Sequence, residues 1–403
     1  MIEELLARSG ADHVELLQER QELLRFGGSR ITYQHSEEKV TLRARRGRAC
    51  VTLGSLDAEL LQARLKDAPR GKLEPAPQIA PRQANTAFAA TEAATPADRV
   101  ELFRSYVTAL PAGANLGGSI AHTVVDHAVA NAAGVLREER RTRALVQLIA
   151  SQEGRSSYAR ALHRDAAQLP SLATVADGLA SLPERSLEPG RYRAVLGPQA
   201  LIVFAATLGQ IAFHPTDGAF AQRLGERVLG ENVSLVDDGA DPDGLPTTFD
   251  CEGTPKQRVQ LIEHGVATGV IRRDTGHAAP PAWRFGAGPS PSHLFLVPGK
   301  VDDAGLVAAC DTGLAIQRVD YVRTVQPKQT LVTGSSRDAT LWLERGRPVA
   351  RLPQFRFTLR LDELFSSLEA LGARRERGET AFMESVVAPG AVASAFPVDV
   401  VTG

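Results

Sequence analysis

Residues 193–213 read RAVLGPQALIVFAATLGQIAF, and this stretch sets the expectation for the C-terminal half. Arg193–Leu196 predicts a strand, and Pro198 can open a helix because its missing N–H would be unpaired at a helix start anyway. The chain beyond consists mostly of short apolar runs separated by Gly and Pro, plus one predicted late helix, Asp362–Leu371, before Gly372. The pattern predicts a curved, barrel-like antiparallel β domain with flanking helices.

The N-terminal half is expected to combine helices with antiparallel strands. Extended runs are predicted at His13–Leu17, Ile31–Gln34, Val40–Ala44 and Ala49–Leu53, and through Ser119–Ala150 with a break at Asn131–Gly134. Apolar residues at helical spacing predict helices near residues 2–6, 60–65, 100–110 and 172–182, and a further helical face at Phe220, Leu224 and Val228. Gly10 suits the left-handed end of the first helix, and Ser55 or Asp57 can cap the second.

These elements predict an α+β protein of two domains. The N-terminal α/β domain is expected to comprise residues 1–68 and 98–188. Residues 69–97 contain five prolines among Ala, Gln and Thr, which is typical of a linker or a long surface loop. The C-terminal β-rich domain is expected to comprise residues 189–403.

Composition excludes several classes of partner. Lys and Arg total 46 against 47 Asp and Glu, so no positive field favours nucleic acid or an anionic membrane. Three cysteines form no CxxC pair, which argues for a reducing compartment. The N-terminus shows no secretory signal, and the longest apolar run, Ala200–Leu208, is too short to cross a bilayer. We expect a cytoplasmic protein.

Motifs for independent catalysis are weak. His122 and His127 are five residues apart and cannot both face one ion on a helix or a strand. Gly288-Pro289-Ser290-Pro291-Ser292 resembles a GxSxG nucleophile turn only loosely. Cys251 stands between Asp250 and Glu252, whose charges would raise the pKa of the thiol and weaken it as a nucleophile.

Phosphate-binding loops are not supported either, because Val301 follows Lys300 where Ser or Thr is needed and Gly286-Ala287-Gly288 lacks a third glycine. The basic residues Arg43, Arg45, Arg46 and Arg48 surround a predicted turn at Arg46-Gly47, and we expect them to form a solvated hairpin tip.

An ordered series of segments is more specific than any single motif. It comprises Leu224–Val228 (LGERV), Val233–Asp238 (VSLVDD), Thr248–Pro255 (TFDCEGTP), Leu261–Val266 (LIEHGV), Ser290–Leu296 (SPSHLFL) and Pro298-Gly299. The series resembles the TldD/PmbA family of bipartite metalloproteases, strongly over residues 191–403 and more loosely over residues 1–190.

The resemblance is to the TldE (PmbA)-like subunit. In this family the TldD-type subunit carries an HExxxH helix, and the metal activates water for peptide hydrolysis. The corresponding window here, Ala200–Phe213, contains neither His nor Glu, and Glu379–Ser385 (ETAFMES) lacks the expected cysteine ligand. The resemblance therefore implies no catalytic and no metal-binding residue in this chain, and zinc in a TldD-like, HExxxH-bearing partner.

The same resemblance implies a dimer enclosing a cavity in which an unfolded peptide is held through its main chain. The residues we expect at that cavity or at the subunit interface, as substrate-binding residues, are Asp250, Glu252, Gly253, Thr254, Ser290, Pro291 and Ser292. An alternative interpretation is that the charged and turn residues among them only cap turns.

Three functions follow from these considerations. The first is a non-catalytic TldE-like subunit of a heterodimeric metalloprotease that cleaves unfolded peptides, for example in leader-peptide processing. The second is a homodimeric peptide-binding or scaffold protein of the same fold without peptidase activity. The third is an independent hydrolase that uses Cys251 or a serine.

Overall fold

The N-terminal half forms one six-stranded antiparallel sheet. The computed structural model describes residues 1–71, 80, 82–277, 289–338, 340–380 and 383–402. The strand order is β3-β2-β1-β4-β5-β6. The strands are β1 (His13–Gly27), β2 (Arg30–Arg46), β3 (Ala49–Leu53), β4 (Asn115–Asn131), β5 (Leu136–Gln152) and β6 (Arg155–His163). The separate runs expected between residues 13 and 44 are thus parts of two long strands.

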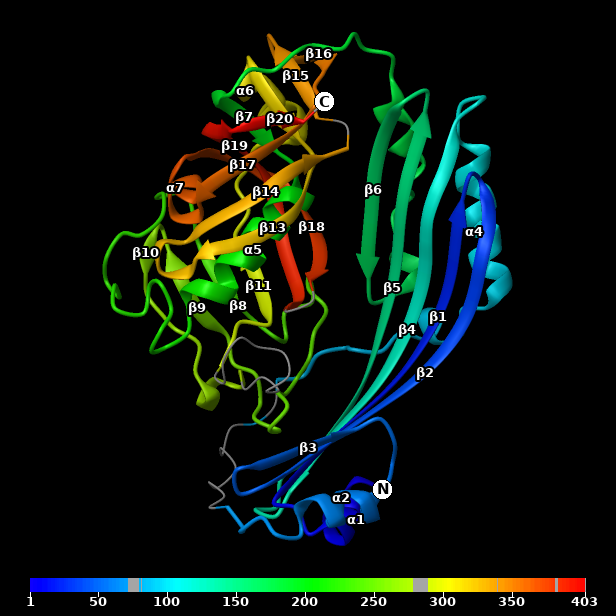
Figure 1. Cartoon of the computed structure of the whole chain (residues 1–403), viewed down its shortest axis with the longest axis vertical. Coiled ribbons are helices and arrows are strands. Elements are labelled where there is room, and N and C mark those ends of the chain that lie inside the picture. The colour runs from blue at the N-terminus through cyan, green and yellow to red at the C-terminus, as the bar shows by residue number, and fades with distance from the viewer. Residues whose placement is uncertain (72–79, 81, 278–288, 339, 381–382, 403) are drawn as a thin grey trace.

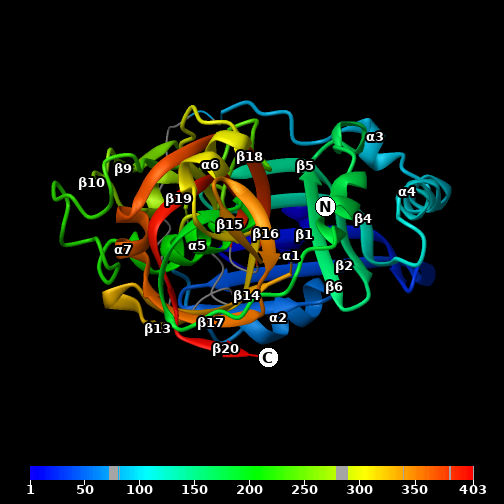
Figure 2. The same ribbon diagram turned by 90° about the horizontal axis from the view of Figure 1, so that it is seen from above.

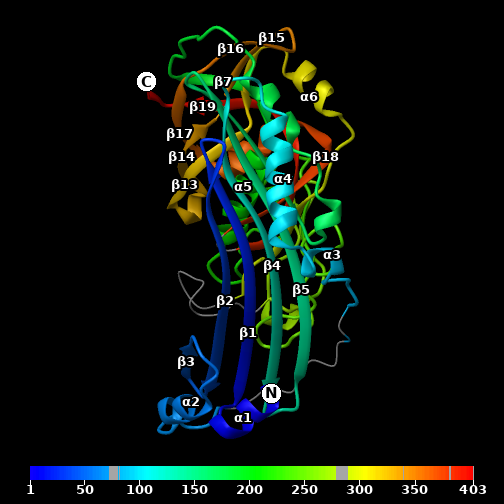
Figure 3. The ribbon, with the colours of Figure 1, turned by 90° about the vertical axis from the view of Figure 1, so that its right-hand side faces the viewer.

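Helices cover one face of this sheet. They are α1 (Ile2–Ser9), α2 (Ala58–Leu65), α3 (Ala89–Glu92), α4 (Pro96–Thr108), η1 (Ala166–Gln168) and η2 (Ala173–Leu179). Gly10 ends α1 with a positive φ of 64°, and Asp57 caps α2 by accepting from the N–H of Leu60. Phe26 of β1 packs on Phe103 of α4 at a ring-centroid distance of 4.8 Å. Figures 2 and 3 show α4 along the side of the sheet that faces away from the C-terminal half.

The C-terminal half contains two further sheets (Figure 1). The larger one runs in the order β10-β9-β8-β11-β19-β7-β12-β15-β16, with β18 paired to β19, and the smaller one in the order β13-β14-β17-β20. Their strands are β7 (Gly190–Leu196), β8 (Leu235–Asp237), β9 (Val259–Glu263), β10 (Val266–Ala267), β11 (His293–Leu296), β12 (Gly313–Ile316), β13 (Arg318–Gln326), β14 (Leu331–Arg337), β15 (Leu341–Glu344), β16 (Arg347–Arg351), β17 (Gln354–Arg360), β18 (Leu368–Thr380), β19 (Met383–Val398) and β20 (Val400–Thr402). The predicted α+β class is confirmed. Among the described strands the pairs β11–β19 and β7–β12 are parallel, and the large sheet does not close into a barrel.

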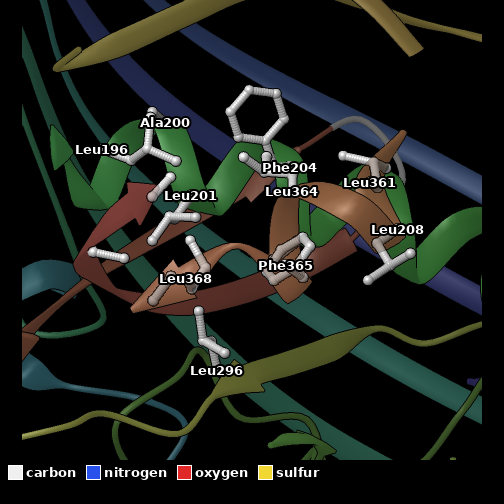
Figure 4. Packing of buried hydrophobic residues seen from close by; sticks show 14 of the residues in the cluster. Leu196, Ala200, Leu201, Phe204, Leu208, Leu296, Leu361, Leu364, Phe365 and Leu368 are labelled. Carbon is white, nitrogen blue, oxygen red and sulfur yellow. The ribbon is translucent and has the colours of Figure 1, made fainter. Parts of the chain in front are cut away.

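The helix α5 (Pro198–Ala212) forms the centre of this half. It begins at Pro198 as predicted, and its residues Leu201, Phe204 and Leu208 are fully buried. An α-helix that is apolar on all sides belongs in a core. Figure 4 shows these side chains beside Leu361, Leu364, Phe365 and Leu368, and Leu296 of β11 also contributes to this cluster. Further helices among the described residues of this half are α6 (Asp303–Cys310), α7 (Leu361–Ser366), η3 (Arg273–Thr275) and η5 (Pro327–Gln329).

Three helix predictions were wrong. The late helix ends at Ser366, and the following residues form β18, because pairing with β19 overrides their helical spacing. Residues 220–228 form turns; there the N–H of Val228 donates to Gly265 O at 2.8 Å, and Leu224 is 50% exposed. Near residues 172–182 only the short 3-10 helix η2 forms.

The two halves use separate parts of the chain. The six-stranded sheet takes its strands from residues 13–163, and the other two sheets take theirs from residue 190 onward. The domain ranges 1–68, 98–188 and 189–403 stay predictions. Within the predicted linker the structure describes residues 69–71, 80 and 82–97, which include α3 and the start of α4. In the described residues no helix combines the length and the apolar character that a membrane span requires.

The packing around α5 generates a prediction about stability. Phe204 is fully buried and lies against Phe357 at 5.7 Å and Phe396 at 6.2 Å between ring centroids. We expect Phe204→Ala to lower the free energy of unfolding by roughly 3–5 kcal/mol, because it removes transfer energy and leaves a cavity. Val325→Ala, at a side chain that is half exposed, should change it by less than about 0.5 kcal/mol. Urea titration of both variants measures the difference, and equal effects would contradict this packing.

Candidate functional site

The uncovered face of the six-stranded sheet is charged and meets the C-terminal half. Side chains alternate between the two faces of a strand, so residues paired in register share a face. Glu15 pairs with Arg43 across β1 and β2, and His127 pairs with Glu139 across β4 and β5. The charged face carries odd-numbered residues of these four strands: His13, Glu15, Glu19, Lys39, Arg43, Arg45, His127, Glu139, Arg141 and Arg143.

Buried ionic contacts link these side chains across the sheet. Arg43 Nη1 donates to Glu15 Oε2 at 2.5 Å, and His127 Nε2 contacts Glu15 Oε1 at 3.2 Å. His127 Nδ1 lies 3.7 Å from Glu139 Oε1. The side chains of Glu15, His127 and Glu139 are only 5–6% exposed. Charged groups so far from water require opposite charges or hydrogen bonds.

The contacts continue into the C-terminal half. Arg141 Nε lies 3.6 Å from Glu139 Oε1, and Arg141 Nη1 donates to Glu384 Oε2 at 2.8 Å. Glu139 Oε2 accepts two hydrogen bonds of 2.8 Å, from the N–H and the hydroxyl of Thr248. We refer to Arg43, Glu15, His127, Glu139, Arg141 and Glu384 together as the ion chain. It ties β19 and the segment around Thr248 to the sheet.

The surroundings shift the pKa values within the ion chain. Burial alone would lower the pKa of His127, but hydrogen bonds to Glu139 and Glu15 outweigh it and raise that pKa. Burial alone would raise the pKa of Glu384, whereas Arg141 and then Lys256 bring it down to about 2. Both shifts favour the charged form of the group, that is, the imidazolium of His127 and the carboxylate of Glu384.

A second hydrogen-bond chain lies beside the first. Lys256 Nζ donates to Ser292 Oγ at 2.5 Å, Ser292 Oγ lies 2.9 Å from His293 Nδ1, and His293 Nε2 lies 2.8 Å from the carbonyl oxygen of Leu245. Because a carbonyl can only accept, Nε2 carries the proton and Nδ1 accepts from Ser292. His293 Nε2 is also 3.8 Å from Glu384, so the two chains meet.

Asp237 fixes the backbone of this second chain. Its Oδ2 accepts from the N–H groups of Ser292 and His293 at 2.8 and 3.0 Å, and its Oδ1 lies 2.7 Å from His277 Nε2. Burial opposes ionisation of Asp237, but His277 outweighs it and lowers the pKa of that carboxyl group. Burial, assisted by Lys256, lowers the pKa of His293 from 6.5 to about 4, so its imidazole is neutral.

The predicted residues 250–254 form a tight turn against the sheet. Asp250 Oδ1 accepts from the N–H groups of Glu252 and Thr254 at 2.9 and 3.0 Å. Gly253 has φ of 80°, and a Cβ there would lie 2.6 Å from Val135 Cγ1, so only glycine fits. Glu252 pairs with Arg45 at 3.4 Å and with Arg273. Asp250 therefore caps the turn, as the alternative interpretation expected. Substrate binding by residues 250–254 stays a prediction.

The predicted residues 290–292 lie in the second hydrogen-bond chain. The Ser290 N–H donates to His277 O at 3.1 Å, and Pro291 is buried. Ser292 is half-buried between Lys256 and His293. The structure brings this segment close to the turn through Lys256, two residues beyond Thr254. Residues 286–288, which were considered for a phosphate loop and a nucleophile turn, lie outside the described residues.

Cys251 is not an activated nucleophile. Burial raises the pKa of its thiol well above the usual value, and Glu15, Asp250 and Glu252 add to the shift. Its carbonyl oxygen contacts His13 Nε2 at 2.9 Å, which is a structural role. His122 and His127 lie on opposite faces of β4, as their spacing requires.

One prediction about the arginine cluster was wrong. Arg43 is 13% exposed in its side chain and pairs with Glu15, and Arg45 reaches Glu252. The turn between β2 and β3 consists of Gly47 and Arg48, one residue beyond the expected Arg46-Gly47. Charged residues alternate along each strand in the sequence; on β5, for example, Glu139, Arg141 and Arg143 lie on one side. This alternation could have indicated a charged face of the sheet that packs against further charged residues.

A cavity of about 220 Å³ opens between the charged face and the C-terminal half, and we call it the basic pocket. Its lining includes Lys39, Arg43, Arg141, Arg143 and Arg164 together with the apolar side chains of Leu17 and Leu245. A larger hollow of about 560 Å³ lies between α1 and α2, but its charged residues Glu4, Arg8 and Glu59 are more than half exposed. Only the smaller cavity adjoins the buried charges.

The residues that the structure describes do not fit a catalytic zinc ion. Zinc in proteins is bound by Cys, His, Asp and Glu side chains. The polar side chains of α5 are those of Gln199, Thr207 and Gln210, and none of these is such a ligand. Within the residues that the structure describes, no three His, Cys, Asp or Glu side chains are placed to hold a metal ion.

The fold defines a class of α+β protein that is known from solved structures. TldE from Thermococcus kodakarensis is similar with a TM-score of 0.82 and 15% identity, covering 99% of this chain and 98% of that one. A proposed modulator of a DNA gyrase from Thermotoga maritima has a TM-score of 0.79 and 18% identity, with 98% of each chain covered. A proposed modulator of DNA gyrase from Bacteroides thetaiotaomicron has a TM-score of 0.74 and 15% identity, covering 99% and 97%.

A family model described as the PmbA/TldA metallopeptidase C-terminal domain matches residues 189–399, more than half of the chain. The chain therefore belongs to the PmbA/TldD family, and the resemblance inferred from the ordered segments is confirmed. Comparison with curated proteins gave no significant match.

The neutral state of His293 generates a prediction about pH. The folded state protonates His293 only near pH 4, whereas the unfolded chain does so near pH 6.5. The unfolded state thus binds more protons in this window, and the stability contributed by neutral His293 is lost as pH falls from 6.5 to 4. We compare the free energy of unfolding of the wild type with that of His293→Gln. As pH falls from 6.5 to 4, we expect the wild type to lose about 3 kcal/mol relative to the variant. Chemical denaturation at a series of pH values measures it, and a pH-independent difference would contradict the assignment.

Proposed function

We propose that this chain is a metal-free, TldE-like subunit of a two-chain cytoplasmic metallopeptidase. A TldD-like partner that bears an HExxxH helix would hold the zinc ion and cleave unfolded peptides, for example leader peptides. Membership of the PmbA/TldD family supports the reaction class. The proposed role in this pair rests on the composition of α5.

The composition of α5 is the observation that carries the proposal. In this chain the helix is part of the apolar core, with Leu201, Phe204 and Leu208 fully buried. Hydrolysis by a metallopeptidase needs a metal with an open coordination position and a base beside it. Since α5 has no ligand or base, restoring a centre there would require several simultaneous substitutions in a packed core.

The contribution proposed for this chain is to bind and orient the peptide. Among the residues expected at the substrate cavity, Glu252, Ser290 and Ser292 are half-buried and remain partly accessible. Asp250, Gly253, Thr254 and Pro291 are buried and would act by holding the backbone of the two segments in place. An extended peptide bound through its main chain would be accepted with little sequence restriction.

The test uses this chain alone, an HExxxH-bearing homologue alone, and both together. We expect copurification of the two chains, cleavage of an unfolded peptide by the pair only, and loss of that cleavage on addition of a chelator. Metal analysis should find zinc in the partner and substoichiometric zinc in this chain. Ser292→Ala and Cys251→Ala variants of this chain should leave cleavage by the pair measurable, because neither residue performs the chemistry.

Other results would assign a different function. Cleavage by this chain alone, abolished by Cys251→Ala or Ser292→Ala, would establish an independent hydrolase. A stable homodimer that binds peptides but gains no activity with any HExxxH-bearing homologue would favour the scaffold alternative. Stoichiometric zinc held by this chain alone would refute the proposed role.

A further inference from the structure

The basic pocket contains more positive charge than its surroundings compensate. Five cationic side chains line it, those of Lys39, Arg43, Arg141, Arg143 and Arg164. Its two carboxylates are already in contact with cations: Glu384 accepts from Arg141 at 2.8 Å, and Glu19 lies 3.9 Å from Arg143. Among the lining groups alone, positive charges exceed negative ones.

Carboxylates outside the cavity neutralise only part of this excess positive charge. Glu15 compensates Arg43, and Glu379 compensates Arg143 at 2.5 Å. Lys39 and Arg164 have no carboxylate within 4.0 Å in the part of the chain that the structure describes. Arg164 instead stacks on Phe88 at 5.1 Å and donates from Nη1 to Asn85 O at 3.2 Å. Asp243, Asp241 and Asp165 act on the charge of Arg164 from beyond 4.0 Å, so an anion from outside the chain would not have to displace an ion pair of the described residues at either cation.

Three of the lining arginines are partly enclosed by protein. The Nε atoms of Arg43, Arg141 and Arg164 are buried and have no hydrogen-bond partner among the described residues. A guanidinium presents its donors in a planar fork that matches the two oxygens of a carboxylate. The Nε atoms themselves are enclosed by protein, so a ligand in the pocket would contact the partly exposed remainder of these side chains.

The volume of the pocket and its apolar lining residues favour a small ligand that has an apolar part next to its carboxylate. The volume of about 220 Å³ is below the roughly 300–1,000 Å³ of sites for larger ligands, so it suits one or two peptide residues. Leu17, Val125, Leu245 and Pro246 supply apolar surface beside the cations. A net charge of −1 over the whole chain offers nothing to attract a polyanion such as nucleic acid.

We propose that the basic pocket binds a carboxylate group of a peptide, with Lys39 and Arg164 as the principal cations that recognise it. The carboxylate can be the C-terminus of the peptide or an Asp or Glu side chain. The proposal rests on the proposed function only in taking a peptide as the ligand.

Binding to the full-length chain alone tests the proposal by calorimetry with three short peptides. Ac-Ala-Ala-Gln-Ala-NH2 is neutral, Ac-Ala-Ala-Glu-Ala-NH2 carries a side-chain carboxylate, and Ac-Ala-Ala-Gln-Ala-OH carries a terminal one. We expect at least one anionic peptide to bind about tenfold more tightly than the neutral peptide, and which one does so identifies the source of the carboxylate.

Variants assign this preference to the pocket. Lys39→Gln changes an exposed side chain, so folding is preserved, and it should reduce the preference several-fold, as should Arg164→Gln. Arg193→Gln removes a cation that pairs with Glu369 elsewhere and should leave the preference unchanged. Equal affinity for all three peptides, no measurable binding of any of them, or an unchanged preference in Lys39→Gln would overturn the proposal.

The two proposals fail separately. A carboxylate preference that depends on Lys39, found together with a lack of partner-dependent cleavage, supports the pocket and refutes the subunit role. Partner-dependent cleavage without any carboxylate preference supports the subunit role and refutes the pocket.

Discussion

Burial of ionised side chains between two layers is the constraint on which this structure depends. One face of the N-terminal sheet is apolar and packs on α1, α2 and α4, while the other carries the ion chain. Removing a carboxylate or guanidinium from water costs several kcal/mol unless a partner compensates it. Arg141 finds that partner in Glu384 of β19, and Glu139 finds donors in Thr248. The position of the C-terminal half on the sheet is thus specified by charge as well as by shape.

The same contacts place the candidate site. Glu384 connects the ion chain with His293, Ser292 and Lys256, and the basic pocket opens beside Arg141 and Glu384. The apolar core around α5 includes Met383 and Leu294, which adjoin Glu384 on β19 and His293 on β11. Identities of 15–18% with solved structures establish the fold alone, so function must be argued from the site.

Much of the fold could be predicted from local sequence, whereas few of the contacts in the candidate site could. Gly10, Asp57 and Pro198 mark helix ends through their own backbone chemistry, and these boundaries were correct. The predicted helix extended too far because Leu368 and Leu371 have helical spacing, and only pairing with β19 places them in a strand. The alternation of charged residues places Arg43 on one face of its strand, but it does not identify the partner, Glu15, which is 28 residues away. Contacts such as Arg141 with Glu384 join residues 243 apart, which no local pattern encodes.

The most direct test of this account is a double-mutant cycle on Arg141→Met and Glu384→Gln, with the free energy of unfolding as the readout. Each single change leaves a partly buried charge without its nearest partner and should cost about 1–3 kcal/mol, because the side chains of Arg141 and Glu384 are 18% and 30% exposed. The double variant should be more stable than the sum of the single effects predicts, by about 2 kcal/mol or more. Additive effects within about 0.5 kcal/mol would show that this pair does not couple the two layers, and would contradict the account.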